Sequence, residues 1–255
     1  MSQSHRAKKR FGQNFLIDAG IIFQIVEAIN PQAGDPLIEI GPGLAAMTKP
    51  VLARAKEMTV IELDRDLIEN LEKMEGLRVI NEDVLNVDLP ALYPDQKLRI
   101  IGNLPYNIST PIIFHLLEDH HDILDMHFML QKEVIDRLAA EPNSRQYGRL
   151  SVMVQRYCDV VPLFEIPPTA FDPAPKVMSQ FVRLVPHTEP KYAIADDNRF
   201  FEVVKLAFSM KRKMIRNNLK PLMSEAEMEA AGIDPTARAE NLTIDDFVTL
   251  SNALV

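Results

Sequence analysis

The sequence predicts a doubly wound, Rossmann-like α/β fold whose sheet is mostly parallel, with an antiparallel hairpin at one edge and a small helical domain after it. Three observations indicate this. Short apolar, β-rich segments recur about every 20 residues with helical periodicity between them. The last two strand-like segments flank a proline-rich connection at residues 167–175. From Asp196 onward the pattern is helical only.

Each element has its own local signal. Asp18 is placed to cap a helix whose apolar face includes Ile21, Ile25 and Ile29, and Asp64 is placed to cap another. Because strands that alternate with helices form parallel sheets covered on both faces, the strand ends should share one edge. Strands are expected at 37–40, 58–62, 77–81, 98–101 and 126–130, and further helices at 48–55, 111–117, 133–141 and 147–157.

The C-terminal third closes the sheet and then changes character. Residues 160–166 and 177–184 are expected to form the antiparallel edge hairpin. We expect a first domain at 1–190, which includes a basic N-terminal arm at 1–17, and a helical domain at 191–255. A single helix over 198–220 would place Lys205, Arg212, Arg216 and Lys220 in one narrow stripe.

Composition limits the class of protein. An apolar fraction of 47% suits a globular core, and no apolar run approaches the length of a membrane span. The N-terminus has no signal-peptide pattern, and the single Cys158 fits a reducing compartment, so a cytoplasmic location without membrane attachment is expected. The six histidines show no paired-ligand spacing, so we expect no metal site.

The net charge of −8 would argue against a nucleic-acid partner if it were spread evenly. Basic residues instead gather in two acid-free stretches, at 1–17 and 205–220. Segregated charge of this kind can still bind a polyanion, although each stretch could equally be a solvated surface. The residues expected to contact nucleic-acid phosphates are Arg6, Lys8, Lys9, Arg10, Lys205, Arg212, Arg216 and Lys220.

Four candidate ligand groups follow successive strands. Gly41 and Gly43 allow a close backbone approach, and Glu62 ends the second strand, where a carboxylate can accept hydrogen bonds from ribose hydroxyls. Asp83 follows the third strand and Asn103 the fourth. Each alone could be a turn or a helix cap. Together, at the carboxyl edge of a parallel sheet, they predict a nucleoside-type cofactor.

The segment Asn103-Leu104-Pro105-Tyr106 adds a second function. Asn103 supplies an amide, Pro105 keeps Leu104 extended with an available carbonyl, and Tyr106 presents a flat ring. Two acceptors beside a ring suit an exocyclic amine on a planar base. The alternative is an ordinary strand-to-helix turn.

The glycine run distinguishes between cofactors. A dinucleotide site favours a third glycine, where this chain has Ala46, and Pro42 removes a backbone donor. A nicotinamide dehydrogenase is therefore the less favoured enzyme class. S-adenosylmethionine, with a ribose and adenine but no phosphate, fits better.

Several motifs together resemble the bacterial small-subunit ribosomal RNA adenine dimethyltransferases of the KsgA type, also called RsmA, over nearly the whole chain. The glycine motif is shared by many methyltransferases, whereas the arm motif and Gly-Asn-Leu-Pro-Tyr-Asn are specific. The matching segments are 10–16 (Arg-Phe-Gly-Gln-Asn-Phe-Leu), 39–44 (Glu-Ile-Gly-Pro-Gly-Leu), 60–64 (Val-Ile-Glu-Leu-Asp), 102–110 (Gly-Asn-Leu-Pro-Tyr-Asn-Ile-Ser-Thr), 171–177 (Phe-Asp-Pro-Ala-Pro-Lys-Val) and 212–217 (Arg-Lys-Met-Ile-Arg-Asn).

The resemblance implies an S-adenosylmethionine-dependent methyltransferase domain and an rRNA substrate. It implies cofactor contacts by Asn14, Leu16, Gly41, Glu62, Asp83 and Asn103. It also implies double N6-methylation of two adjacent adenosines in the 3′-terminal hairpin loop of 16S rRNA, on an immature 30S subunit during ribosome biogenesis. A monomer is the default oligomeric state.

We expect the target base to leave its stack and enter the pocket. Asn103 and the Leu104 carbonyl would accept its N6 hydrogens, Pro105 would hold the loop extended, and Tyr106 and Phe171 would stack on opposite faces of the base. Other possible functions are a resistance-type methyltransferase of 23S rRNA and an assembly factor that acts mainly by binding the immature subunit. A DNA adenine methyltransferase is less favoured, since those usually have a second proline where Leu104 stands.

Overall fold

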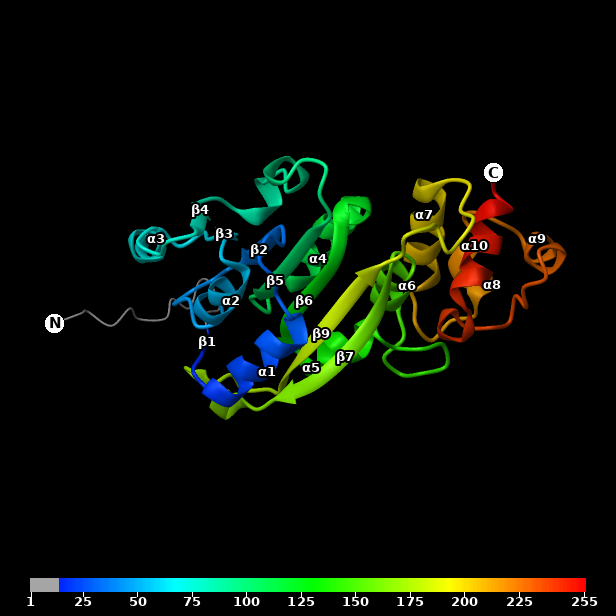
Figure 1. Cartoon of the computed structure of the whole chain (residues 1–255). Helices are drawn as coiled ribbons and strands as arrows, with labels where there is room; N and C mark the ends of the chain where they lie inside the picture. The colour runs from blue at the N-terminus through cyan, green and yellow to red at the C-terminus, as the bar shows by residue number, and fades with distance from the viewer. Residues whose placement is uncertain (1–13) are drawn as a thin grey trace. The chain divides into compact units, whose positions relative to one another are not determined.

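A computed structural model describes residues 14–255 (Figure 1). Its main sheet has the strand order β4-β3-β2-β5-β6-β9-β7, and a second, two-stranded sheet joins β1 to β8. The strands are β1 (Phe15–Leu16), β2 (Leu37–Ile40), β3 (Met58–Ile61), β4 (Leu77–Ile80), β5 (Leu98–Asn103), β6 (Ile123–Gln131), β7 (Cys158–Ile166), β8 (Phe171–Asp172) and β9 (Ser179–Pro186).

The five strands from β4 to β6 are parallel, and β9 pairs antiparallel to β6. The expected doubly wound sheet with an antiparallel edge is therefore confirmed. The chain runs outward from β2 through β3 to β4, and then returns to place β5 on the other side of β2. The strand order thus reverses between β2 and β5, which is where ligands bind in open α/β sheets.

Contacts divide the chain into two compact units. Among the described residues, the first comprises 14–135 and 160–186, and the second comprises 136–159 and 187–255. The segment 136–159 therefore groups with the C-terminal residues, whereas the sequence pattern predicts it within a first domain at 1–190. The helices are α1 (Ala19–Ile29), α2 (Thr48–Ala55), α3 (Arg65–Leu71), α4 (Ser109–Glu118), α5 (Lys132–Leu138), α6 (Arg149–Gln155), α7 (Asp197–Ala207), α8 (Ile215–Leu219), α9 (Glu225–Ala230) and α10 (Ile244–Asn252).

Helix ends in the first unit follow the sequence signals. The Asp18 carboxylate accepts a hydrogen bond from Ile21 N at 2.9 Å, and α1 ends at Asn30 in the left-handed conformation. Asp64 caps α3 in the same way, accepting from Asp66 N at 3.2 Å. These caps satisfy backbone donors that a helix start leaves unpaired, so they fix where each helix leaves the sheet edge.

The core of the first unit lies between the sheet and helices α1, α2 and α3. Val26, Val51 and Leu67 contribute one residue from each of these helices to the buried cluster, and Val60 and Ile101 contribute from β3 and β5. Residues that alternate with these along the strands are also buried, which confirms that the sheet is covered on both faces. Among residues 14–255, no helix combines the length and apolar composition needed to cross a bilayer.

The single helix expected over 198–220 is wrong. Helix α7 ends at Ala207 and α8 begins only at Ile215. The physical reason is the buried Asn218 side chain, whose Nδ2 donates to the carbonyls of Ala207 at 2.5 Å and Met210 at 3.2 Å. An amide that binds the carbonyl end of a helix stabilises its termination, so the chain turns there.

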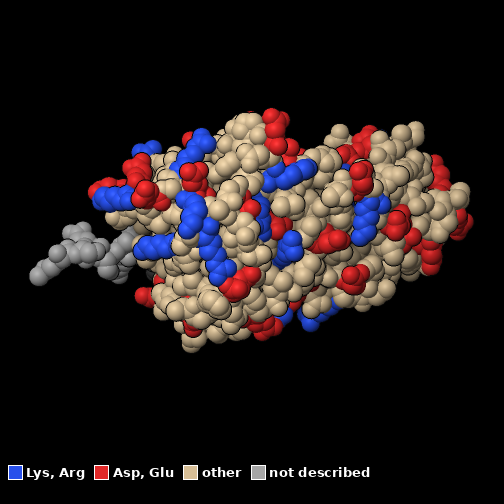
Figure 2. All heavy atoms as spheres, in the orientation of Figure 1, with Lys and Arg blue, Asp and Glu red and all other residues tan. Residues whose placement is uncertain are grey.

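The basic residues of this segment consequently do not form a helical stripe. Lys205 lies on α7, Arg212 in the turn, Arg216 on α8 and Lys220 after it. Arg216 pairs with Glu225 at 2.9 Å, which partly neutralises its charge. On the face shown in Figure 2, Lys and Arg side chains lie among Asp and Glu side chains. Arg6, Lys8, Lys9 and Arg10 lie outside the residues that the structure describes.

Candidate functional site

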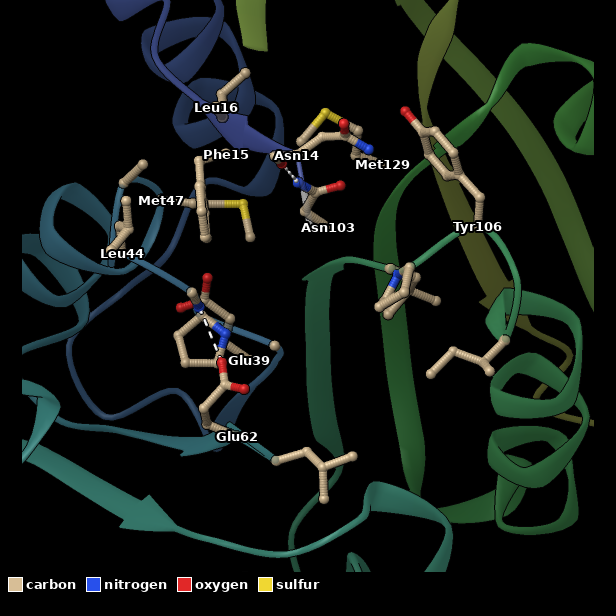
Figure 3. Close-up of a pocket in the computed structure, with 18 of the residues that line it drawn as sticks. Asn14, Phe15, Leu16, Glu39, Leu44, Met47, Glu62, Asn103, Tyr106 and Met129 are labelled. Atoms are coloured by element: carbon tan, nitrogen blue, oxygen red, sulfur yellow. Dashed lines mark hydrogen bonds between the residues drawn. The ribbon is translucent and has the colours of Figure 1, made fainter. Parts of the chain in front are cut away.

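A cavity of about 360 Å³ lies at the point where the strand order reverses. It is lined by main-chain and side-chain groups from the loops after β2, β3, β4 and β5, and by the segment that includes β1 (Figure 3). The structure brings together all six residues expected to bind cofactor and four of the five expected to act on the substrate. These lining residues are Asn14, Leu16, Gly41, Glu62, Asp83, Asn103, Leu104, Pro105 and Tyr106.

The glycine loop after β2 is shaped by backbone conformations that favour glycine. Gly41 has φ +69° and Gly43 φ +55°. A Cβ on Gly43 would lie 3.2 Å from the Phe15 ring, so this ring packs directly against the loop. A side chain at Gly43 would therefore have to displace the Phe15 ring, whereas glycine leaves the backbone open to close approach by a ligand.

The Glu62 side chain binds the backbone of the glycine loop. Its Oε2 accepts from Gly43 N at 3.1 Å and its Oε1 from Asp64 N at 2.8 Å. Burial raises the pKa of Glu62, and the hydrogen bonds from Asp64 and Gly43 partly oppose that rise. The carboxylate is thus held by the backbone with its oxygens at the cavity wall, where it can accept from hydroxyl groups.

Asp83 follows β4 and caps a short 3₁₀ segment, since its Oδ1 accepts from Leu85 N at 3.1 Å. Its other oxygen, Oδ2, takes no part in that cap. Asp83 therefore does act as a cap, which was one of the two alternatives considered from the sequence, and it also lies on the cavity wall. Asp83 can act as a hydrogen-bond acceptor for a ligand while keeping its structural role.

Glu39 also lines the cavity, although no role was expected for it from the sequence. It lies on β2 and is 1% exposed, and its Oε2 has no hydrogen-bond partner among the described residues. Burial raises the pKa of Glu39 to about 8, with the neighbouring Thr48 hydroxyl lowering it and Glu62 raising it further. The sequence does contain a signal for Glu39, namely a carboxylate inside the apolar strand Leu37–Ile40. Because a carboxylate is costly to bury, its presence there indicates a functional or structural role.

Asn103 is oriented by the chain's N-terminal segment. Its Nδ2 donates to the Asn14 carbonyl at 3.1 Å, as Figure 3 shows. Because a carbonyl accepts and cannot donate, this bond selects one of the two amide orientations. The Asn103 Oδ1 then points the other way and remains an acceptor within the cavity. Asn14 therefore fixes which atom of Asn103 a ligand would meet.

The loop after Asn103 presents a second acceptor. The carbonyl of Pro105 accepts from Ile108 N at 3.1 Å, and that of Tyr106 from the Ser109 hydroxyl at 3.4 Å. In residues 14–255 no hydrogen bond ends on the Leu104 carbonyl, while Leu104 N donates to Met129 O at 3.3 Å. One main-chain acceptor therefore lies close in sequence to the Asn103 amide and the Tyr106 ring.

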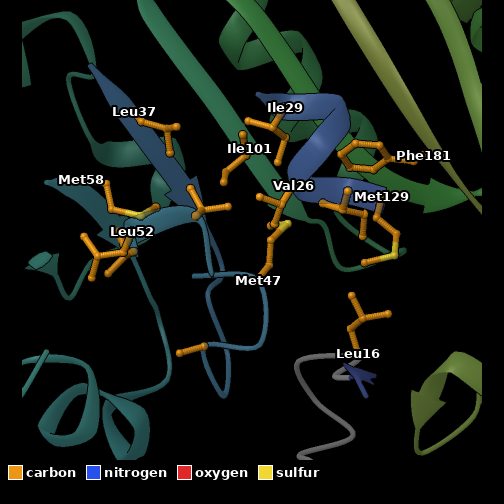
Figure 4. Packing of buried hydrophobic residues seen from close by; sticks show 14 of the residues in the cluster. Leu16, Val26, Ile29, Leu37, Met47, Leu52, Met58, Ile101, Met129 and Phe181 are labelled. Carbon is orange, nitrogen blue, oxygen red and sulfur yellow. The ribbon is translucent and has the colours of Figure 1, made fainter. Parts of the chain in front are cut away.

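Phe171 does not line the cavity, which corrects the expected stacking role. Its side chain is 3% exposed and belongs to the hydrophobic cluster shown in part in Figure 4. The reason is the short antiparallel pairing of β8 with β1, in which Phe171 lies opposite Leu16. The cavity-lining side chains that were not expected from the sequence include Phe15, Leu44, Met47, Leu63 and Met129.

Comparisons with known proteins match nearly the whole chain to one family. Residues 4–255 match the family described as ribosomal RNA adenine dimethylase. A relative from Idiomarina loihiensis, named ribosomal RNA small subunit methyltransferase A, is 54% identical over 98% of this chain and 88% of its own. A relative of the same name from Vibrio vulnificus is 53% identical over 98% of this chain and 95% of its own.

Solved structures share the fold. A dimethyladenosine transferase from Plasmodium falciparum has a TM-score of 0.75 at 24% identity, covering 92% of this chain and 95% of its own. The 23S rRNA methyltransferase ErmE has a TM-score of 0.71 at 26% identity, covering 94% and 99%. With a family match over nearly its whole length and relatives above 50% identity, the chain belongs to the ribosomal RNA adenine dimethylase family.

Proposed function

We propose that this chain transfers methyl groups from S-adenosylmethionine to N6 of two adjacent adenosines in the 3′-terminal hairpin loop of 16S rRNA. The proposed substrate is an immature 30S subunit in the cytoplasm, and the protein is proposed to act as a monomer. S-adenosylmethionine is the methyl donor of this class of rRNA methyltransferase. The observation that carries the proposal is the oriented Asn103 amide beside the Leu104 carbonyl and the Tyr106 ring.

The cavity suits S-adenosylmethionine. Glu62 is held at the end of β3, where its carboxylate can accept from ribose hydroxyls, and Asp83 at the end of β4 can accept from an adenine amine. The orphaned Oε2 of Glu39 offers a buried hydrogen-bonding atom to a polar group of the ligand. Asn14, Leu16 and the Gly41 backbone complete the wall.

The chemistry requires positioning more than proton transfer. The bound cofactor supplies a methyl group that is already activated by its sulfonium. Adenine N6 is a weak nucleophile because its lone pair is delocalised into the ring. Asn103 Oδ1 and the Leu104 carbonyl accept hydrogen bonds from the two N6 hydrogens, which favours a pyramidal nitrogen and stabilises the positive charge that develops there. On transfer the methyl group would leave its sulfur as a neutral thioether, and N6 would release one hydrogen as a proton to solvent. Tyr106 would stack on the extruded base and fix its orientation for transfer.

Replacing Asn103 tests this assignment. Asn103→Ala should reduce kcat about 100-fold or more, because a preorganised acceptor of the transition-state charge is lost. Binding of S-adenosylmethionine, measured by calorimetry, should persist, since the other wall residues remain. Asn198→Ala, at an exposed position on α7, is the matched control. Near-normal turnover by Asn103→Ala with normal cofactor binding contradicts the mechanism.

The exposed basic residues of 205–220 are proposed to bind RNA phosphates. The pairing of Arg216 with Glu225 makes Lys205 and Arg212 the better residues to reverse. Reversing both to Glu should weaken RNA binding and reduce the salt slope by about 0.7 to 0.9 for each phosphate that is no longer neutralised. Arg78→Glu, exposed on β4, controls for charge reversal at a site away from this segment. Unchanged RNA affinity in the double variant, or an equal loss of cofactor binding, contradicts this role.

The substrate proposal has one enzymatic rival, methylation of 23S rRNA. The names of the relatives above 50% identity favour the small subunit, whereas the 23S rRNA methyltransferase ErmE is 26% identical. Incubating the protein with labelled S-adenosylmethionine and unmethylated small or large subunits, followed by nucleoside analysis, separates the two. Dimethyladenosine on small subunits supports the proposal. Label on large subunits alone, or subunit binding without label, overturns it in favour of 23S methylation or a binding role.

A further inference from the structure

Tyr106 is tied to the sheet through its hydroxyl group. The Tyr106 Oη lies 2.6 Å from the Oγ of Ser179, a residue of β9 that is 0% exposed. Either oxygen can donate in this pair. Ser179 is fixed in turn by the sheet, where it lies opposite Gln131 of β6. The tip of a ring carried on a loop is thereby anchored to a residue that the sheet holds in place.

The main chain of Tyr106 is held by a second, separate hydrogen bond. The Tyr106 carbonyl accepts from Ser109 Oγ at 3.4 Å, and Ser109 is buried at the start of α4. Backbone and hydroxyl are thus anchored to different elements, which leaves the ring little freedom to rotate or swing. A ring on which a base stacks needs this restricted motion, because a small displacement of the bound base from the reactive geometry lowers the rate by a large factor.

Ser179 is not among the residues that line the cavity. Burying the Ser179 hydroxyl group would cost free energy if it had no hydrogen-bond partner, and Tyr106 supplies that partner. Burial raises the pKa of Tyr106 further above its ordinary value of 10.0, so loss of the phenol proton does not interrupt this hydrogen bond near neutral pH.

We propose that Ser179 is a positioning residue for methyl transfer, which holds the Tyr106 ring at the angle required to stack on the target adenine. This inference rests on the proposed function, because it assumes that Tyr106 stacks on the substrate base. It adds a residue outside the cavity, contributed by β9, to the groups that determine turnover.

The test is a double-variant cycle with Ser179→Ala and Tyr106→Phe. Each variant removes the same hydrogen bond from one side. Each should lower kcat on unmethylated small subunits about fivefold, the factor that loss of one neutral hydrogen bond produces. The double variant should also lose about fivefold instead of the product of the two losses, since the bond can be removed only once. Affinity for S-adenosylmethionine should not change.

Ser251→Ala is the matched control. Ser251 is a buried serine of α10 whose hydroxyl donates to the Val248 carbonyl at 2.9 Å, and its loss should leave kcat unchanged. If Ser179→Ala folds poorly, Tyr106→Phe alone still tests the proposal, because it keeps Ser179 and the whole ring except one oxygen. Wild-type kcat in either single variant, or independent losses that multiply in the double variant, overturns the proposal.

The outcomes separate this inference from the proposed function. If the wild-type protein forms no dimethyladenosine on small subunits, the proposed function fails. If Tyr106→Ala retains full turnover, the stacking role of Tyr106 fails and the positioning role of Ser179 fails with it. If Tyr106→Ala is inactive while Ser179→Ala turns over normally, only the inference about Ser179 is overturned.

Discussion

Replacing Glu39 by glutamine should change how stability depends on pH. The Glu39 carboxyl is 1% exposed, and its pKa rises from 4.5 to about 8 on folding, chiefly through burial. Between these values the folded protein holds a proton that the unfolded chain releases. Unfolding free energy therefore falls as pH rises through this window. Glutamine has the same shape and does not titrate.

The magnitude follows from the size of the shift. One pKa unit corresponds to about 1.36 kcal/mol, so the full shift is worth about 5 kcal/mol above pH 8. Between pH 5 and pH 8, linkage gives a change of about 3.5 kcal/mol from this group. The unfolding free energy of Glu39→Gln minus that of the wild type should therefore increase by about this amount across the interval. Taking the difference removes the contribution of every other titrating group common to both proteins.

Urea denaturation followed by circular dichroism at pH 5, 6, 7 and 8 measures this difference. Glu57→Gln removes a carboxylate at an exposed position and serves as the matched control. We expect its difference from the wild type to stay nearly constant over the same range. A change below about 1 kcal/mol for Glu39→Gln would refute the reasoning, because it would mean that folding does not keep this carboxyl protonated.

Two glycines give further predictions. Gly102→Ala should lower unfolding free energy by about 1 to 3 kcal/mol, since a Cβ there would lie 2.8 Å from the Ile40 carbonyl oxygen. In the same urea assay Gly148→Ala, whose nearest neighbour would be 4.0 Å away, should behave like the wild type. Gly43→Ala should cost about 1 to 2 kcal/mol through its positive φ, and should weaken S-adenosylmethionine binding in calorimetry because the new methyl group meets Phe15. Unchanged stability in Gly102→Ala, or unchanged cofactor affinity in Gly43→Ala, would contradict the packing around these two glycines.

The elements that could be predicted from sequence are those whose stabilising contacts are periodic along the chain. Helix α2 has the expected limits because its buried residues recur on one face, at Thr48, Val51, Leu52 and Ala55. The predicted cofactor-binding residues Gly41, Glu62, Asp83 and Asn103 could be placed at one cavity because parallel strands bring their carboxyl ends to one edge. The cofactor class could be predicted for the same reason, and the rRNA substrate could be predicted because specific motifs resemble those of a known family.

The parts that could not be predicted depend on contacts between distant residues. The break between α7 and α8 is caused by Asn218, which binds a carbonyl 11 residues earlier, and the periodicity of the apolar residues does not reveal this. Phe171 reads as an exposed aromatic in a proline-rich loop, yet its pairing with Leu16 buries it. The bond between Tyr106 and Ser179 spans 73 residues and leaves no local signal.

The pairing of β1 with β8 also bears on biosynthesis. Residues 15 and 16 emerge from the ribosome early, but their strand partners, Phe171 and Asp172, are made much later. Until then, the cavity wall formed by Asn14, Phe15 and Leu16 has no strand against which to align. A nascent chain that stops short of residue 171 should therefore lack the strand partner of this part of the wall, so we expect the cavity to be complete only after β8 has been made.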